Sequence, residues 1–189
     1  MWKRTIPMVL TGMMLGAVLI ASAQHPAAAE GYADDRARIL DLQARYMFAI
    51  DWQDAETYAG TFTQDGVLVS GFGTYRGRDE IKSLINNLAE KDAYQTEEGD
   101  ANEIPPRTRH HIDNVVLDID GDTATGVAYW TMLTTNNPDR TPQVQAFGHY
   151  EDELVKKNGE WYFKRREIYN VILPERMGSD ENPAARLMR

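Results

Sequence analysis

The sequence contains no cysteine, and its basic residues are outnumbered by its acidic ones. Without cysteine the chain can form no disulfide, no thiolate nucleophile and no cysteine-ligated metal site. Lys and Arg total 20 against 29 Asp and Glu, so the formal net charge is −9. This charge disfavours binding to nucleic acid or to an anionic membrane surface. A small molecule or another protein chain remains as the expected partner.

Long hydrophobic runs are missing beyond the N-terminus. Residues 1–5 are short and basic, residues 6–21 are largely apolar, and Ala21-Ser22-Ala23 and Ala27-Ala28-Ala29 offer small-residue cleavage sites. This order predicts a secretory signal peptide over residues 1–29, with an uncleaved N-terminal anchor as the alternative. We therefore expect a periplasmic or secreted protein with no membrane span after processing. The main domain is expected over residues 30–173, and residues 174–189 form a C-terminal extension without periodicity.

The hydrophobic periodicity changes along the chain. Apolar residues at helical spacing predict helices over residues 35–50, 54–62 and 79–88. A short strand is expected at 67–69, and residues 91–109 form a polar connection. Alternating segments rich in β-branched and aromatic residues predict four strands at 111–119, 123–134, 143–156 and 160–172. Asp120-Gly121-Asp122 and Asn158-Gly159 are hairpin signals, so antiparallel pairing is expected.

This order of elements predicts an α+β fold in which about three N-terminal helices cover one face of a curved antiparallel sheet. Such a sheet forms a cone, and its open end would be a small-molecule pocket.

Short motifs follow one another in this framework. In chain order they are Tyr46-xxxx-Asp51, Phe62-xx-Asp65-Gly66, Gly77-Arg78-xx-Ile81, Thr108-Arg109-His110-xxx-Asn114, Asp120-Gly121-Asp122-xx-Thr125, and Gly148-x-Tyr150-x-Asp152 before Gly159-x-Trp161. Their order resembles the SnoaL-like group of the nuclear-transport-factor-2-like superfamily, and within it the branch of scytalone dehydratase and bile acid 7α-dehydratase. The resemblance implies a cofactor-free acid–base lyase or isomerase acting on a hydrophobic ring compound.

His110 is the first catalytic candidate, because an imidazole can accept and return a proton near neutral pH. The family pattern selects it over His111, and the two must face opposite sides of a regular strand. Asp51 matches the catalytic aspartate of both dehydratases and could fix the tautomer of the histidine. The alternatives are a strand histidine that bonds to a neighbour and an exposed carboxylate at the helix end.

Tyr46 matches the active-site tyrosine of the bile acid enzyme and could assist a leaving hydroxyl. Its helical phase alone would make it a core aromatic. The second histidine or aspartate of these dehydratases has no counterpart in residues 128–132, where Tyr129 and Thr131 are the polar substitutes.

Further residues are candidates for substrate binding. His149 is a possible second acid–base group, although an outward strand position is the better interpretation. Arg165 or Arg166 could meet an acidic substrate group, with an ion pair to Asp152 as the favoured interpretation. The expected substrate-binding residues are Tyr129, Thr131, Trp52, Phe72, Phe147 and His149.

No metal site and no cofactor are expected. His110 and His111 are adjacent, and the sequence has no HExxH pattern, no GxGxxG loop and no GxSxG elbow. We therefore expect a lyase that eliminates water, or formaldehyde from a lignin-derived diaryl compound, by His110, Asp51 and Tyr46. The alternatives are a non-catalytic carrier of a hydrophobic ligand and an isomerase. The protein is expected to be a homo-oligomer, a dimer or a trimer.

Overall fold

The computed structural model describes residues 28–96 and 107–187. The predicted signal peptide lies almost wholly outside the described residues, as does most of the predicted polar connection. In the described part, no helix is long and apolar enough to cross a membrane.

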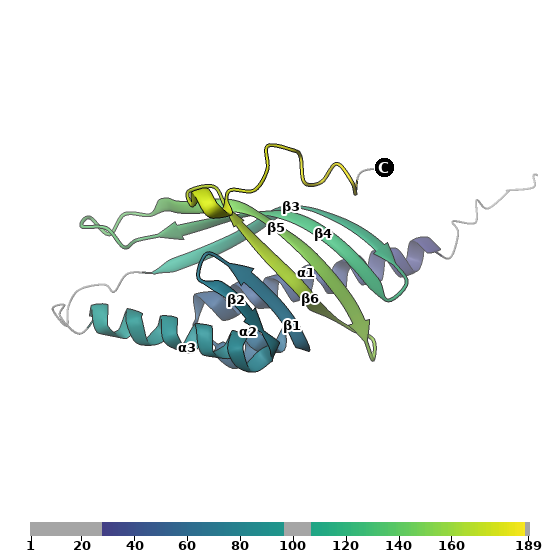
Figure 1. Cartoon of the computed structure of the whole chain (residues 1–189), viewed down its shortest axis with the longest axis horizontal. Helices are drawn as coiled ribbons and strands as arrows, with labels where there is room; N and C mark the ends of the chain where they lie inside the picture. Colours follow the sequence, from purple (N-terminus) through teal and green to yellow (C-terminus); the bar gives the residue numbers. More distant parts are fainter. Residues whose placement is uncertain (1–27, 97–106, 188–189) are drawn as a thin grey trace, which may run out of the picture.

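Three α-helices precede the four long strands in the chain, as the colours of Figure 1 show. They are α1 (Ala28–Asp51), α2 (Ala55–Gly60) and α3 (Gly77–Thr96). Helix α1 buries one stripe, which includes Ile39, Leu42 and Tyr46. Helix α2 starts at the predicted N-cap, where Asp54 Oδ1 accepts a hydrogen bond of 3.0 Å from the Thr57 amide. Helix α3 extends past its predicted end at residue 88 to Thr96, because Ala, Glu and Lys favour helix.

The six strands described form one curved sheet in the order β2-β1-β6-β5-β4-β3. Strands β1 (Phe62–Ser70) and β2 (Gly73–Arg76) form a hairpin, and β2 was hidden in the sequence by its glycines. The long strands are β3 (Thr108–Asp120), β4 (Thr123–Thr134), β5 (Gln143–Lys157) and β6 (Glu160–Asn170). All four predicted long strands are present.

The α+β class and the curved sheet are thus confirmed, with one difference from a purely antiparallel sheet. Strands β1 and β6 pair in parallel, with Leu68 opposite Arg166. These strands lie far apart in the chain, and no turn signal announces their pairing. The other neighbouring strands are antiparallel, and the predicted turns are where expected, with Asn158 and Gly159 at φ of 54° and 82°.

Helix α1 packs against β3 and β6, while α3 packs against β1. The sheet therefore has an inner face turned toward the helices and an outer face. A bulge between Asp113 and Val116 interrupts β3, with Asn114 at a φ of 51°. Bulges bend a strand and increase its twist, which helps β3 to curve around α1, where Arg36 donates to the Val115 carbonyl.

The predicted extension lies against the outer face. It begins with a short 3-10 helix, η1 (Pro174–Arg176), and Arg176 Nη2 donates to the Ile168 carbonyl at 2.8 Å.

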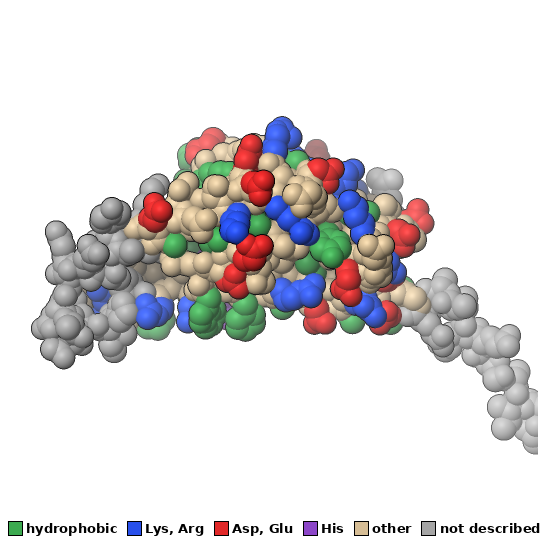
Figure 2. All heavy atoms as spheres, turned by 90° about the horizontal axis from the view of Figure 1, so that it is seen from below, with side chains coloured by type: hydrophobic (Ala, Val, Ile, Leu, Met, Phe, Trp, Pro, Cys, Tyr) green, Lys and Arg blue, Asp and Glu red, His purple; other side chains and the backbone are tan. Residues whose placement is uncertain are grey.

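Seen from below (Figure 2), acidic and basic side chains are mixed over the surface, with hydrophobic side chains between them. This face therefore carries no continuous basic stripe.

Candidate active site

Asp51 and His110 come together at the end of α1. Asp51 is the last residue of that helix, and His110 is the third residue of β3. The His110 Nδ1 atom lies 2.6 Å from Asp51 Oδ1. The backbone amide of His110 donates to the same carboxylate, at 2.9 Å to Oδ2. One carboxylate therefore fixes both the backbone and the ring of the histidine.

This geometry assigns the roles of the two ring nitrogens. With Nδ1 donating to the carboxylate, Nε2 carries the free lone pair and is the nitrogen that can accept a proton. The side chains are 5% exposed for Asp51 and 16% for His110. The pair is thus shielded from bulk solvent, but the imidazole is still accessible.

The neighbours of His110 on the inner face are apolar. His110 lies opposite Met132 in the sheet register, and Met132 lies opposite Ala146. The Trp130 ring is centred 6.5 Å from the imidazole. Its indole nitrogen donates to the Tyr169 carbonyl at 2.9 Å, which holds the ring in place. A molecule that reaches His110 would meet an aromatic and aliphatic wall.

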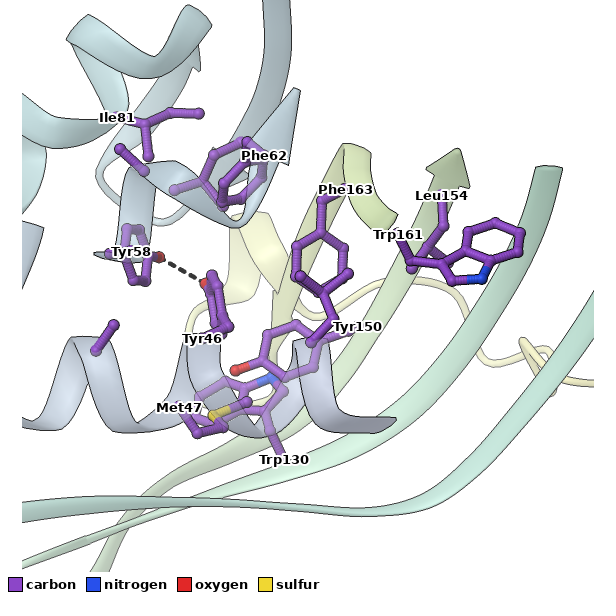
Figure 3. Packing of buried hydrophobic residues seen from close by; sticks show 14 of the residues in the cluster. Tyr46, Met47, Tyr58, Phe62, Ile81, Trp130, Tyr150, Leu154, Trp161 and Phe163 are labelled. Atoms are coloured by element: carbon purple, nitrogen blue, oxygen red, sulfur yellow. Dashed lines mark hydrogen bonds between the residues drawn. The ribbon is translucent and has the colours of Figure 1, made fainter. Parts of the chain in front are cut away.

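Tyr46 does not lie free beside the dyad. It is 2% exposed, and its hydroxyl lies 2.6 Å from the hydroxyl of Tyr58 (Figure 3). Burial raises the pKa of Tyr46, although Arg166 and the Tyr58 hydrogen bond act in the opposite direction. Its phenol is thus used in an internal pair, as the core interpretation would have it, and the expected role in leaving-group departure loses its geometric basis.

A buried ion pair lies beside Tyr46. Arg166 donates from Nε and Nη2 to the two carboxylate oxygens of Asp152, at 2.8 and 2.7 Å. Its guanidinium carbon lies 4.3, 4.1 and 3.9 Å from the ring centres of Tyr46, Tyr150 and Phe163. Burial by itself would lower the pKa of Arg166, but Asp152 outweighs it and the pKa is raised. The favoured interpretation of Arg166 as an ion-pair partner of Asp152 therefore agrees with the structure.

The predicted substrate-binding residues are not brought to the dyad. In the sheet register, Tyr129, Thr131, Phe147 and His149 point to the outer face, opposite to His110. Tyr129 is 51% exposed and Phe147 47%. The alternation along β4 places Trp130, not Tyr129, on the inner face. The expectation that these four line the same pocket as His110 is therefore wrong in this structure.

Two other predicted aromatic residues lie on the surface. Phe72 is 69% exposed in the turn between β1 and β2. Trp52 follows Asp51 directly and packs between Phe48, at 5.5 Å between ring centres, and the Arg109 guanidinium, at 4.1 Å. It lines a groove of about 560 Å³ on the outer side of α1 together with Phe48 and Arg45. Trp52 is thus near the dyad along the chain, but this groove is separate from the inner face.

His149 lies under the C-terminal extension. Its ring stacks on Tyr169 at 4.4 Å, and Nε2 is 3.7 Å from a carboxylate oxygen of Glu151. These residues form the floor of a cavity of about 370 Å³, whose other side is lined by side chains from residues 179–186. The outward position favoured from the sequence is thus observed. It places His149 away from the dyad.

The stability of the protein should fall in mild acid because of His149. Burial lowers the pKa of His149 below its ordinary value of 6.5, and Glu151 only partly opposes this. His149 then binds a proton in the unfolded chain at a pH where it stays neutral in the folded chain. The free energy of unfolding therefore decreases as the pH falls through the ordinary pKa of histidine. Melting temperatures from neutral pH to about pH 5 should fall less in His149→Gln than in the wild type. An unchanged slope in His149→Gln, with the exposed His111→Gln as control, would contradict this.

Two core residues near the site were not singled out as candidates for it. Tyr58 of α2 and Tyr150 of β5 are buried aromatic residues with a hydroxyl group, and both lie beside Tyr46. Periodicity identifies such residues as core, and nothing in the sequence shows which of them lie near the site. A possible signal was the Gly148-x-Tyr150-x-Asp152 motif.

Comparisons with known proteins agree with this fold. The chain resembles a protein of unknown function from Mycobacterium tuberculosis, with a TM-score of 0.66 at 25% identity over 87% of this chain and 88% of that one. It also resembles an NTF2-like protein with a cystatin-like fold from Novosphingobium aromaticivorans, with a TM-score of 0.63 at 24% identity over 90% of this chain and 99% of that one. A candidate scytalone dehydratase from the same species gives 0.59 at 21% identity over 75% and 87%.

A comparison with curated proteins finds no match in sequence. The family profile of the SnoaL-like domain matches residues 31–167. The match runs from the exposed first turns of α1 into β6, the strand that carries the buried Arg166. This range contains Asp51, His110 and the whole sheet except the last three residues of β6. The chain therefore belongs to the SnoaL-like family, in the NTF2-like superfamily.

Proposed function

We propose that the protein is a cofactor-independent lyase that removes a proton from a hydrophobic, aromatic small molecule and expels an oxygen leaving group. The observation that carries this proposal is the Asp51–His110 pair, with 2.6 Å between Oδ1 and Nδ1. The SnoaL-like family includes many enzymes, dehydratases among them, which agrees with the assignment.

In the proposed reaction His110 Nε2 takes the proton from carbon. The imidazole becomes positively charged, and the Asp51 carboxylate, held on Nδ1, compensates that charge. The electron pair of the broken C–H bond forms a double bond as the C–O bond breaks. The apolar neighbours Trp130, Met132 and Ala146 support a hydrophobic substrate rather than a sugar or a phosphate ester.

Conversion by the purified protein tests this proposal. β-Hydroxypropiophenone reports loss of water by this C–H and C–O cleavage. A diaryl compound with a hydroxymethyl group beside a benzylic hydroxyl reports loss of formaldehyde. In that case His110 takes the proton of the hydroxymethyl oxygen, formaldehyde leaves as the C–C bond breaks, and the electron pair of that bond forms the double bond as the benzylic hydroxyl departs. A new conjugated double bond, followed by absorbance and mass spectrometry, is the expected product. Binding of both compounds without conversion would contradict the lyase and support the non-catalytic carrier.

We further propose that the mature protein is exported and forms a homodimer through the outer face of the sheet. Tyr129 and Phe147 lie in the open there, although aromatic residues of this size are usually covered. Light scattering should give twice the mass of the chain. Tyr129→Lys together with Phe147→Lys should give a folded monomer, whereas a wild-type monomer at every concentration would contradict the proposal.

A further inference from the structure

The elimination needs a proton donor for the departing oxygen, and Tyr46 is already engaged. Its hydroxyl bonds to Tyr58 inside the core. Tyr150 is a third buried tyrosine of this cluster, at 3% exposure. None of the hydrogen bonds found among the described residues uses its hydroxyl. The hydroxyl of a buried tyrosine usually finds a hydrogen-bond partner, so this one is suited to a partner that arrives with the substrate.

Tyr150 lies on the same face of the sheet as His110. On β5 it is four residues after Ala146, which belongs to the row of His110 and Met132. The Trp130 ring is a neighbour of both residues. Its centre lies 6.0 Å from the centre of the Tyr150 ring and 6.5 Å from the centre of the His110 ring. Figure 3 shows the Tyr150 hydroxyl pointing away from its own strand, toward helix α1 near Met47.

The charges around Tyr150 suit a donor. Burial raises the pKa of its phenol well above 10, and Tyr46, Asp152 and Asp51 act in the same direction. The phenol therefore keeps its proton until a strongly basic oxygen takes it. The Arg166 guanidinium, 4.1 Å from the ring centre, opposes this rise and would stabilise the phenolate that forms.

We propose that Tyr150 donates the proton to the leaving oxygen in the elimination that His110 begins. This role rests on the proposed lyase function. The C–H bond breaks and its proton goes to His110 Nε2. The C–O bond breaks with its electron pair on oxygen, which takes the Tyr150 proton and leaves as water. The proton on His110 then returns to the Tyr150 phenolate through solvent.

A pair of probes with different leaving groups tests this role. β-Hydroxypropiophenone must lose hydroxide, which needs a proton, whereas β-(para-nitrophenoxy)propiophenone loses a stable phenolate that needs none. Tyr150→Phe keeps the ring contacts with Trp130 and Arg166. It should lower turnover of the first probe by about a hundredfold, as for a lost general acid. Turnover of the second probe should change little.

Tyr58→Phe is the matched control, because it also removes one buried tyrosine hydroxyl, but one that bonds to Tyr46. It should leave the ratio of the two rates unchanged. Equal losses on both probes in Tyr150→Phe, or no loss on either, would overturn the role of Tyr150. If His110→Ala is inactive in the same assays, the lyase proposal itself still stands. Failure of the wild-type protein to convert either probe would contradict the lyase, and with it this role.

Discussion

Replacing His110 with alanine should lower turnover by a factor of about a hundred or more, because the reaction loses its general base. The change removes an imidazole that is 16% exposed, so the fold should survive. Circular dichroism and the melting temperature check the fold, and the rate with β-hydroxypropiophenone checks the chemistry. His111→Ala is the matched control, since this neighbour is exposed and points to the other face. Near-normal turnover in His110→Ala would refute the catalytic assignment.

The partner variant Asp51→Asn separates orientation from charge. An amide oxygen can still accept hydrogen bonds from His110, but it cannot compensate the positive imidazole that forms during proton transfer. Turnover should fall strongly, and the double variant with His110→Ala should be little slower than His110→Ala alone. Additive losses would mean that the two side chains act independently.

Asp152→Asn should cause the largest loss of stability, about 3–5 kcal/mol, because it leaves the buried Arg166 charge without its counter-ion. Both side chains are 0% exposed, so water cannot replace the lost carboxylate. In a chain of this size such a loss lowers Tm by roughly 6–20 °C. Thermal and urea denaturation measure it.

Two comparisons make this prediction specific. Glu56→Gln breaks the exposed ion pair with Lys82 and should leave Tm almost unchanged. Arg166→Met combined with Asp152→Leu removes both charges and should be more stable than Asp152→Asn alone. A Tm of Asp152→Asn equal to that of Glu56→Gln would contradict a structural role for the buried pair.

The fold was largely predictable because its signals are local. The stripe of Ile39, Leu42 and Tyr46 predicted α1, and Asn158-Gly159 predicted the β5–β6 hairpin, each from adjacent residues. The parallel pairing of β1 with β6 was not predictable, since it joins segments whose contact depends on the closure of the whole sheet.

The candidate site was predictable only where a motif fixed the side of the strand. His110 and Asp51 were selected by family spacing, and the structure brings them together. Tyr129 and Thr131 were selected as polar substitutes without knowing the phase of β4. Since a shift of one residue moves a side chain to the other face, that uncertainty placed them on the wrong side of the sheet.

The position of Asp51 at the last residue of α1 has an electrostatic consequence. The carbonyl groups at the C-terminal end of a helix carry partial negative charge, which adds to the field of the carboxylate. The positive imidazole of the transition state would therefore be stabilised by the whole helix as well as by one side chain. Since the backbone supplies that field, the side chains around His110 could change between relatives, and with them the substrate, while this stabilisation is kept.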